Sequence, residues 1–465
     1  MADERPTVAV LTLGCKLNQA DSEAIARELG GAGVRVVDRP QRGAEAFVIN
    51  SCSVTHVADR KARHMVRLAR RLSPEARVIL TGCYAETAPA NIAELTGADA
   101  VIPSAEKASI PADILARLAE RGDPAAGCPT HVGGGLRTRA FIKIQEGCNE
   151  LCAFCIVPYT RGREVSVPVE RVVQEVRARE AEGVLEVVLT GTQLGNYGRD
   201  LGWGVRSGVD PAPDSSRAKW FSAQTSFALR MTESQEQGPR KLLEALLAET
   251  SVPRIRLSSL QAQDISPELL RLWDDTRLCP HFHLPLQSGS ETVLKAMRRR
   301  YIPDEFRRAL ALVRERVPDA AITTDVIAGF PGETDEDFEA TYALCEEAGF
   351  AAMHCFPYSR RPQTGAAKMA GHLPAPTRRA RLERLLALGR ESSERFRRPF
   401  LGRTMEVLWE DRTADARWQG LTGNYMRVYT AADVPLANRI LPTRLVGIEG
   451  NEMSGEVRSE AMVYR

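Results

Sequence analysis

The sequence predicts an α/β protein in three parts: an N-terminal parallel α/β domain, a central partial (β/α) barrel and a small C-terminal antiparallel β-barrel. Three observations predict this class. Short apolar, β-branched runs alternate with helical patterns near the N-terminus, six further strand candidates follow in the centre, and residues 396–465 show short strands without helices. The 465 residues also fit about three domains of roughly 150 residues each.

Compact apolar runs define the strands of the N-terminal domain, for which we expect the bounds 5–125. In chain order, strand and helix patterns alternate over residues 7–13, 20–30, 46–50, 57–72 and 76–82. Such alternation is typical of βαβ units, which form a parallel sheet. Right-handed crossovers then place the carboxyl ends of all these strands at one edge of the sheet.

A cysteine follows each of these three strands. Cys15, Cys52 and Cys83 stand just past the predicted carboxyl ends, and open α/β sheets bind their ligands at this edge. We therefore expect the three side chains to lie close together in space. Each cysteine alone is a weak signal, because buried free cysteines are common.

A Gly- and Pro-rich stretch over 121–137 is predicted to be a linker, and the central domain is expected over 134–375. Helical patterns separate most of its strand candidates, which cover residues 140–145, 185–191, 254–260, 281–287, 321–330 and 351–359. Six such units predict an open or partial barrel, with its chemistry at the carboxyl ends of the strands. Residues 203–237 break the rhythm, and we interpret them as a surface excursion.

The C-terminal domain is expected over 396–465 and shows strands of alternating hydrophobicity. The candidates cover residues 405–410, 426–430, 443–450 and 453–458, with small turns between them. This pattern predicts a compact antiparallel barrel.

The composition is that of an ordinary globular protein, with 43% hydrophobic and 26% charged residues. No apolar run approaches the ~20 residues of a membrane helix, and the N-terminus lacks the pattern of a secretory signal. We therefore expect a cytoplasmic protein without a membrane partner. In that compartment the ten cysteines are interpreted as metal ligands, redox groups or buried thiols rather than as disulfides.

The formal charge of +2 argues, taken alone, against a protein dominated by polyanion binding. Basic residues nevertheless concentrate in two runs. Residues 60–71 contain six Lys or Arg and no acid, and residues 372–403 contain nine Arg against three Glu. One such run could be a solvated helix face, but two of them favour a polyanion partner.

The strongest local signal is CNELCAFC, in which Cys148, Cys152 and Cys155 have C-x3-C-x2-C spacing. The motif follows a predicted strand through a Glu-Gly turn, so we expect it on a loop at a strand end. Three thiolates can bind three irons of a 4Fe–4S cubane and leave the fourth iron open to the amine and carboxylate of S-adenosylmethionine. The alternative is a structural zinc site, which usually has four ligands in paired knuckles, and a fourth is missing here.

This spacing resembles that of the radical S-adenosylmethionine superfamily. Phe154 occupies the aromatic position that packs near the adenine in that superfamily, with ordinary packing as the alternative role. The resemblance is closer still to one family within it. The segments TLGCKLNQADSE, INSCSVTHVADRKAR and TGCYAE resemble the three cysteine motifs of the methylthiotransferase family.

This family resemblance implies that Cys15, Cys52 and Cys83 hold a second 4Fe–4S cluster, again with one open iron. Further segments resemble the family in the same order, and they cover residues 138–164, 189–198, 254–261, 283–301, 323–334 and 356–369. The C-terminal barrel resembles a TRAM domain, a small β-barrel that binds RNA. The other cysteines match no motif and are interpreted as structural; they are Cys128, Cys279, Cys345 and Cys355.

Three branches of the family differ in substrate: isopentenyladenosine in tRNA, an aspartate of a ribosomal protein, and threonylcarbamoyladenosine in tRNA. LGCKLNQ at residues 13–19 and RRRY at 298–301 resemble the third branch. In the ribosomal branch we would expect Pro-Lys after the first cysteine, whereas Lys16 follows Cys15 directly here. Gln363 and Val165 depart from the family pattern without removing a cluster ligand.

The resemblance implies an enzyme that transfers a methylthio group to carbon 2 of N6-threonylcarbamoyladenosine at position 37 of tRNA. Its implied cofactors are two 4Fe–4S clusters and S-adenosylmethionine. Its implied partners are the tRNA anticodon stem-loop, an electron donor such as flavodoxin or ferredoxin, and a sulfur donor. Two alternatives stay open: a methylthiotransferase acting on isopentenyladenosine, and a non-catalytic Fe–S or zinc protein that binds RNA.

Strand ends supply four more candidates for cofactor binding, beside Phe154: Gly191, Gln193, Gln287 and Gly329. The glycine of GFPGE would allow a ligand to approach the backbone closely, although a plain turn needs glycine equally. No catalytic residue beyond the cluster ligands is predicted. His281 and His283 share one face of a strand, and we interpret them as core residues rather than catalysts.

Overall fold

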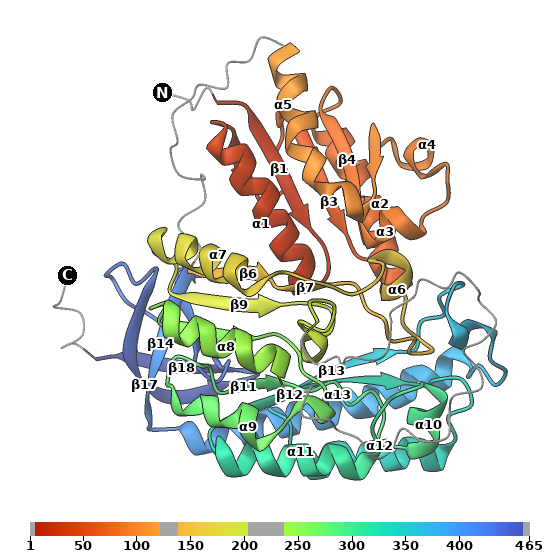
Figure 1. Ribbon diagram of the computed structural model, residues 1–465, viewed down its shortest axis with the longest axis vertical. Helices are drawn as coiled ribbons and strands as arrows, with labels where there is room; N and C mark the ends of the chain where they lie inside the picture. Colours follow the sequence, from red (N-terminus) through yellow and green to blue (C-terminus); the bar gives the residue numbers. More distant parts are fainter. Residues whose placement is uncertain (1–4, 121–137, 203–236, 459–465) are drawn as a thin grey trace.

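The computed structural model of the chain describes residues 5–120, 138–202 and 237–458. Figure 1 shows an N-terminal unit around one sheet, a central unit with two sheets, and a C-terminal barrel. This arrangement confirms the predicted α/β class and the order of its parts. The predicted linker with Cys128, and all but the last residue of the excursion, lie outside the described residues.

The N-terminal unit contains a five-stranded parallel sheet of order β2-β1-β3-β4-β5. Its strands are β1 (Thr7–Thr12), β2 (Arg35–Val37), β3 (Ala46–Ser51), β4 (Arg77–Gly82) and β5 (Ala100–Ile102). The three predicted strands are confirmed. β2 and β5 were not predicted, because three residues are too few for a hydrophobic pattern to stand out.

Helices cover both faces of this sheet. They are α1 (Lys16–Gly31), α2 (His56–Leu72), α3 (Cys83–Thr87), α4 (Ile92–Thr96) and α5 (Ile110–Glu120). Ile25 of α1 and Ile114 of α5 pack on one face, and Val66 of α2 packs on the other. Every residue of β3 is buried between these layers, which explains its continuous apolar run.

The central unit is a partial barrel whose parallel strands follow the order β6-β9-β10 and then β11-β12-β13. They are β6 (Arg139–Lys143), β9 (Glu186–Thr190), β10 (Arg254–Leu257), β11 (His281–His283), β12 (Ala321–Ala328) and β13 (Ala352–Pro357). An isolated bridge between Ile255 and Leu278 links the two sheets where β10 approaches β11. The six predicted strands are confirmed. The wall that they form is divided into two sheets between β10 and β11.

Side chains of this wall alternate between two environments. Ile142, Val187 and Ile255 belong to the apolar core beneath the outer helices. These helices include α7 (Val169–Ala181), α8 (Gln237–Glu249), α11 (Pro303–Arg316) and α12 (Asp335–Ala348). The residues between them on the strands point the opposite way, to what we call the concave side, so Glu186 and Arg256 place charges there.

The C-terminal barrel is closed, with strand order β14-β15-β16-β18-β17. Its strands are β14 (Thr404–Arg412), β15 (Trp418–Thr422), β16 (Arg427–Thr430), β17 (Arg439–Glu449) and β18 (Glu452–Val457). The predicted antiparallel barrel is confirmed, with one exception: β16 and β18 pair in parallel. Five strands cannot alternate in direction around a closed ring, so one pair must run the same way.

The C-terminal barrel contacts the amino ends of the central strands. Arg254 at the start of β10 donates to the carbonyl oxygens of Leu421 and Glu406, at 2.9 and 2.7 Å. Arg139 at the start of β6 donates to the Glu410 carboxylate at 2.6 Å. The opposite, carboxyl ends of these strands point away from the barrel (Figure 1).

None of the described helices combines the length and the apolar character needed to cross a membrane.

Candidate active site

The cysteine loop, residues 148–155, follows a short antiparallel pair, β7 (Gln145–Glu146) with β8 (Val165–Ser166). Backbone bonds fix its path: the Cys148 N–H donates to the Gly162 carbonyl at 3.1 Å, and the Ala153 N–H donates to Met297 at 2.9 Å. The turn before it requires glycine, since Gly147 has φ 72° and a Cβ there would lie 1.9 Å from the Arg163 carbonyl oxygen.

The thiols of this loop lie in partly buried surroundings that disfavour free thiolates. Cys148, Cys152 and Cys155 are all partly buried. Burial raises the pKa of Cys148 and of Cys155 to about 12. Thiolate ligands at this loop therefore need positive charge close by, such as bound iron would provide.

Arg299 places a positive charge beside the loop. Its Nη1 atom lies 3.6 Å from the Cys152 sulfur, and its guanidinium lies 4.9 Å from the centre of the Tyr301 ring. The Tyr301 hydroxyl bonds to the carbonyls of Pro285 and Leu286, which fixes the platform beneath the arginine. Sequence reasoning used this RRRY segment only to choose a branch and missed Arg299 as a site residue.

The sheet-edge cysteines, Cys15, Cys52 and Cys83, follow three neighbouring strands as predicted. Cys15 is the N-cap of α1, Cys52 directly follows β3, and Cys83 begins α3. A Cβ on Gly14 would lie 2.6 Å from the Cβ of Cys52, so the loop before Cys15 passes very close to it. Burial, with smaller effects of Cys83 and Cys15, raises the pKa of Cys52 to about 11.

The two cysteine sets belong to different units but face each other. Helix α6 (Val157–Thr160), which begins just after Cys155, contacts α3, which begins at Cys83. At the same edge, Arg361 from the loop after β13 forms a buried ion pair with Asp59 of α2 at 2.6 Å. The carboxyl ends of the central strands therefore meet the carboxyl ends of the N-terminal sheet.

Arg161, directly after α6, connects the two sets. Its guanidinium donates to the side-chain oxygen of Asn18 and pairs with Asp21 at 3.4 Å and Glu146 at 2.5 Å. Asn18 donates in turn to the carbonyls of Leu13 and Ser51, which precede two of the sheet-edge cysteines. Sequence reasoning missed Arg161 and Asn18, because only the fold brings these segments together.

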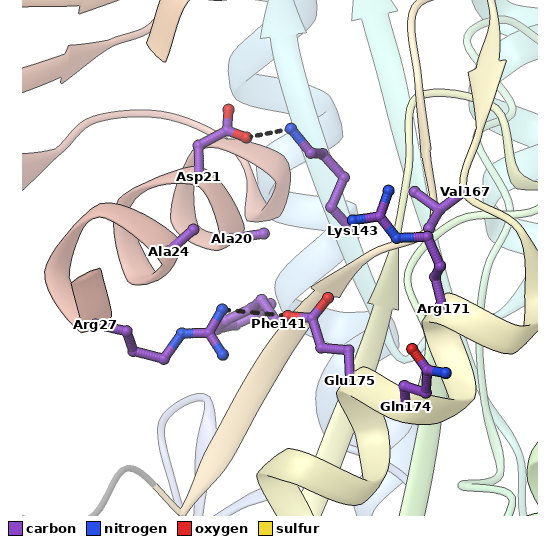
Figure 2. Close-up of a pocket in the computed structure, with 10 residues that line it drawn as sticks. All are labelled: Ala20, Asp21, Ala24, Arg27, Phe141, Lys143, Val167, Arg171, Gln174 and Glu175. Carbon is purple, nitrogen blue, oxygen red and sulfur yellow. Dashed lines mark hydrogen bonds and ion pairs between the residues drawn. The ribbon is translucent and has the colours of Figure 1, made fainter. Parts of the chain in front are cut away.

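Asp21 of α1 is the centre of this ionic network. Its carboxylate is almost fully buried and pairs with Lys107 at 2.6 Å, with Lys143 at 2.7 Å and with Arg161. Burial raises the pKa of Asp21, but these three cations lower it more, to about 2. Figure 2 shows the Asp21–Lys143 pair and, farther along α1, the pair of Arg27 with Glu175 at 3.2 Å.

We expect Asp21→Asn to lower the free energy of unfolding at pH 7 by about 3–5 kcal/mol, because three cations would lose their buried partner. The measurement is urea unfolding of the cluster-free protein. Asp319→Asn is the control, since Asp319 pairs with Arg403 at an exposed site and should cost below about 1 kcal/mol. Equal losses in both variants would contradict a network that holds the units together.

The same network makes a prediction about pH. A carboxyl whose folded pKa lies below its ordinary value contributes stability at higher pH and loses it as pH falls through the folded pKa. The Asp21 contribution should therefore persist at pH 4 and disappear only near pH 2. In urea unfolding, the difference between wild type and Asp21→Asn should shrink only over that last interval.

A cavity of about 480 Å³ lies where the N-terminal and central units meet, between α1 and the β6 and α7 segments (Figure 2). Its ten lining residues are Ala20, Asp21, Ala24, Arg27, Phe141, Lys143, Val167, Arg171, Gln174 and Glu175. None of the six candidate cysteines lines it. The cavity therefore belongs to the contact between units and not to the predicted cluster sites.

The other predicted site residues lie on the cysteine loop or shortly after central strands. Phe154 packs against the small core of Met297 and Phe330. Gly191 has no room for a side chain, because a Cβ would lie 2.8 Å from Leu194 and 3.0 Å from the Gln145 side chain. The Gln193 N–H donates to that same Gln145 side chain at 3.0 Å.

Two further predicted residues have left-handed backbones after central strands. Gln287 is buried with φ 63°, and Gly329 has φ 74°. A Cβ on Gly329 would lie 2.3 Å from the Arg378 side chain, so packing against α13 (Ala375–Arg397) already requires this glycine. Burial lowers the pKa of His281 well below its ordinary value, which keeps it neutral.

Within the described ranges, no three His, Cys, Asp or Glu side chains stand close enough together to bind one metal ion. In a cubane each thiolate binds a different iron, so its ligands stand farther apart. Buried polar atoms near the cysteine loop, Arg299 Nη2 and Gln193 Nε2, also find no hydrogen-bond partner among the described residues.

The two predicted basic runs differ in the structure. In the first, Arg63 and Arg70 bind within the N-terminal unit, whereas Arg60, Lys61 and Arg67 are exposed on α2. In the second, α13 uses most of its arginines internally. The internal acceptors of that run are Tyr358 for Arg378, Glu383 for Arg379, Glu333 and Asp335 for Arg381, Glu339 for Arg384, Glu394 for Arg398 and Asp319 for Arg403.

Comparison with known families agrees with this geometry. Residues 142–345 match the radical SAM superfamily, and residues 7–103 match the uncharacterized protein family UPF0004. The fold resembles a radical S-adenosylmethionine methyltransferase, TsrM, from Kitasatospora setae, with a TM-score of 0.52, 16% identity and coverage of 78% of this chain and 77% of that one. The family match, the fold and the cysteine loop thus define a radical S-adenosylmethionine enzyme. Enzymes of this class use S-adenosylmethionine together with a 4Fe–4S cluster.

Relatives over the whole length define the family. A Bacillus subtilis protein named threonylcarbamoyladenosine tRNA methylthiotransferase MtaB is 33% identical, over 95% of this chain and 94% of the relative. A Mycolicibacterium paratuberculosis protein named tRNA-2-methylthio-N(6)-dimethylallyladenosine synthase is 34% identical, over 95% of this chain and 83% of the relative. The chain belongs to the radical S-adenosylmethionine methylthiotransferase family and, within it, to the MtaB type.

Proposed function

We propose that this chain transfers a methylthio group to carbon 2 of N6-threonylcarbamoyladenosine at position 37 of tRNA. The observation that carries the proposal is the meeting of two cysteine sets at facing strand ends, with Arg161 between them. The names of the MtaB relatives, from four organisms, support the nucleoside. The second candidate is isopentenyladenosine, because the dimethylallyladenosine relatives reach a similar identity.

In this proposal each cysteine set holds one 4Fe–4S cluster. Cys148, Cys152 and Cys155 are the ligands on the loop, and the sheet-edge cysteines are the ligands of the auxiliary cluster. When bound, the two clusters and S-adenosylmethionine supply the electron, the carbon radical, the methyl group and the site for sulfur. The chain's own contribution is to hold these groups at facing strand ends with the substrate base between them.

In this proposal, residues around the cysteine loop orient the bound S-adenosylmethionine. Arg299 offers its unpartnered Nη2 beside the Cys152 sulfur, where it would balance negative charge of thiolates or of a carboxylate. Gly191 and Gln193 shape the end of β9, while Gln287 and Gly329 shape the ends of the wall beyond β11 and β12. Phe154 offers an aromatic surface to the adenine.

The tRNA anticodon stem-loop would approach the edge between the units. Its single-stranded bases can be splayed into a pocket, which paired bases cannot. The exposed cations of α2, Arg60, Lys61 and Arg67, lie on the unit that carries the sheet-edge cysteines and would bind phosphates. A cytoplasmic location, an electron donor such as flavodoxin or ferredoxin, and a sulfur donor complete the proposal.

The proposed domain bounds are 5–125 for the auxiliary-cluster domain, 134–375 for the radical domain and 396–465 for the TRAM domain. The closed five-stranded barrel over β14 to β18 supports the last of these. Helix α13 precedes it and packs against β13, so the barrel is anchored to the central unit.

The test uses the reconstituted protein with a chemical reductant, S-adenosylmethionine and an anticodon stem-loop that carries threonylcarbamoyladenosine. We expect 5′-deoxyadenosine to form and the RNA to gain a methylthio group by mass spectrometry. The same RNA with isopentenyladenosine should react far more slowly. The reverse preference would assign the second candidate, and the absence of 5′-deoxyadenosine with both RNAs would indicate a protein that only binds RNA.

A further inference from the structure

Lys16 belongs to the N-terminal unit but places its positive charge on the concave side of the central unit. It is the first residue of α1 and directly follows Cys15. Its Nζ atom lies 5.5 Å from the centre of the Tyr425 ring, which belongs to the turn between β15 and β16 of the C-terminal barrel. Residues of the first and third units therefore meet inside the second.

Tyr425 is held firmly in this position. It has a left-handed backbone with φ 68°, and its ring stacks on that of His281 with 4.5 Å between the centres. The guanidinium of Arg256 lies 4.8 Å from the same ring. The ring forms a fixed floor on the concave side, with the Lys16 ammonium next to it.

The charges around this floor do not balance. Arg256 pairs with Glu186 at 2.8 Å, and Arg139 pairs with Glu410 at 2.6 Å. Lys16 is half-buried, and in the described part of the chain no carboxylate lies within salt-bridge distance of its ammonium. A cation–π contact with Tyr425 contributes about 0.5–2 kcal/mol, which offsets only part of the cost of desolvating an ammonium.

Two further observations support an excess of positive charge and an unfilled polar environment. Burial raises the pKa of Tyr425, but Lys16, Arg139 and Arg256 lower it more, so that it lies below its ordinary value. The Nδ1 atom of His281 is buried and has no hydrogen-bond partner among the residues that the structure describes. Both features fit a site that takes an anionic group with hydrogen-bonding oxygens.

We infer that the Lys16 ammonium binds the carboxylate of the threonylcarbamoyl group, and so selects an acidic N6 substituent over an apolar one. The inference rests on the proposed function. Consecutive Cα atoms lie about 3.8 Å apart, so Lys16 is tethered beside Cys15 and the proposed sulfur site. An isopentenyl group would remove water from the ammonium without supplying an anion. This desolvation cost would discriminate against the isopentenyl substrate.

The test compares two anticodon stem-loop RNAs that differ only at position 37, which carries threonylcarbamoyladenosine or unmodified adenosine. The reconstituted wild-type protein should bind the modified RNA about tenfold more tightly, as one new charge-assisted hydrogen bond predicts. Lys16→Gln should reduce this affinity ratio to about one. Lys16→Arg should keep most of it, because the charge remains.

Lys61→Gln is the matched control, since Lys61 is an exposed lysine of α2 that would contact only phosphate. It should change the affinities for both RNAs by the same factor. Iron analysis of each variant checks that the neighbouring Cys15 site is intact, and Lys16→Met gives a second charge-free side chain of similar length. A wild-type preference that survives in Lys16→Gln and Lys16→Met would overturn the inference alone. A wild-type protein without any preference would overturn the proposed nucleoside as well.

Discussion

Replacing Cys148, Cys152 and Cys155 together by Ala should reduce 5′-deoxyadenosine formation to background. These thiols occupy one loop at the carboxyl ends of the central strands, with Arg299 against the Cys152 sulfur. Without them the loop has no thiolate left to hold a 4Fe–4S cluster, so iron in the reconstituted protein should fall from about eight to about four atoms per chain. The measurements are iron and sulfide analysis and chromatography of the reaction products.

Cys355→Ala is the matched control for that experiment. Cys355 lies on β13, packs against the central core and belongs to neither cysteine set. It should retain both clusters and the normal yield of 5′-deoxyadenosine, with only a modest loss of stability. Undiminished cleavage of S-adenosylmethionine in the triple variant would contradict the assignment of the loop, and zinc without labile sulfide would contradict the clusters altogether.

Replacing the sheet-edge cysteines, Cys15, Cys52 and Cys83, by Ala should have a different effect. Iron should again fall from about eight to about four atoms per chain. Because the loop and Arg299 are untouched, 5′-deoxyadenosine should still form. Transfer of the methylthio group to RNA should fall below detection, since nothing would hold the sulfur opposite the substrate base.

The two triple variants are controls for each other, because each removes three thiols at a strand edge. A sheet-edge variant that still modifies RNA would contradict the auxiliary site. One that loses both reactions would show that Arg161 and Asn18, which bridge the two sets, transmit damage from one to the other. Asn18→Ala separates these outcomes, since it removes the bridge and leaves all six thiols.

The sequence predicts strands well where burial is continuous. β3 is buried on both faces, and most of the eight residues of β12 are buried, so both strands could be recognised from their sequence. β15 escaped prediction because Gly420 interrupts it. That glycine is required, as a Cβ there would lie 2.6 Å from Val407 and 2.7 Å from the Leu408 carbonyl oxygen. Close packing inside a small barrel therefore removed the signal of the strand.

Cluster ligands could be proposed from sequence because binding a cluster requires cysteines at a characteristic spacing. Their partners could not, since Arg161, Asn18 and Asp21 act through contacts between units. Lys16 is the sharpest case. Its neighbour Tyr425 lies about 400 residues later and reaches it through a left-handed turn that no local pattern announces. Only the docked C-terminal barrel reveals the unbalanced charge on the concave side.

The nucleosides of tRNA from cells with and without this gene show which nucleoside the protein modifies. Mass spectrometry of the digested tRNA should show that 2-methylthio-N6-threonylcarbamoyladenosine disappears without the gene, while its unmethylthiolated precursor accumulates. Complementation with the wild-type gene should restore it, and complementation with the variant lacking the sheet-edge thiols should not. Unchanged levels of that nucleoside, with loss of 2-methylthio-isopentenyladenosine instead, would contradict the account.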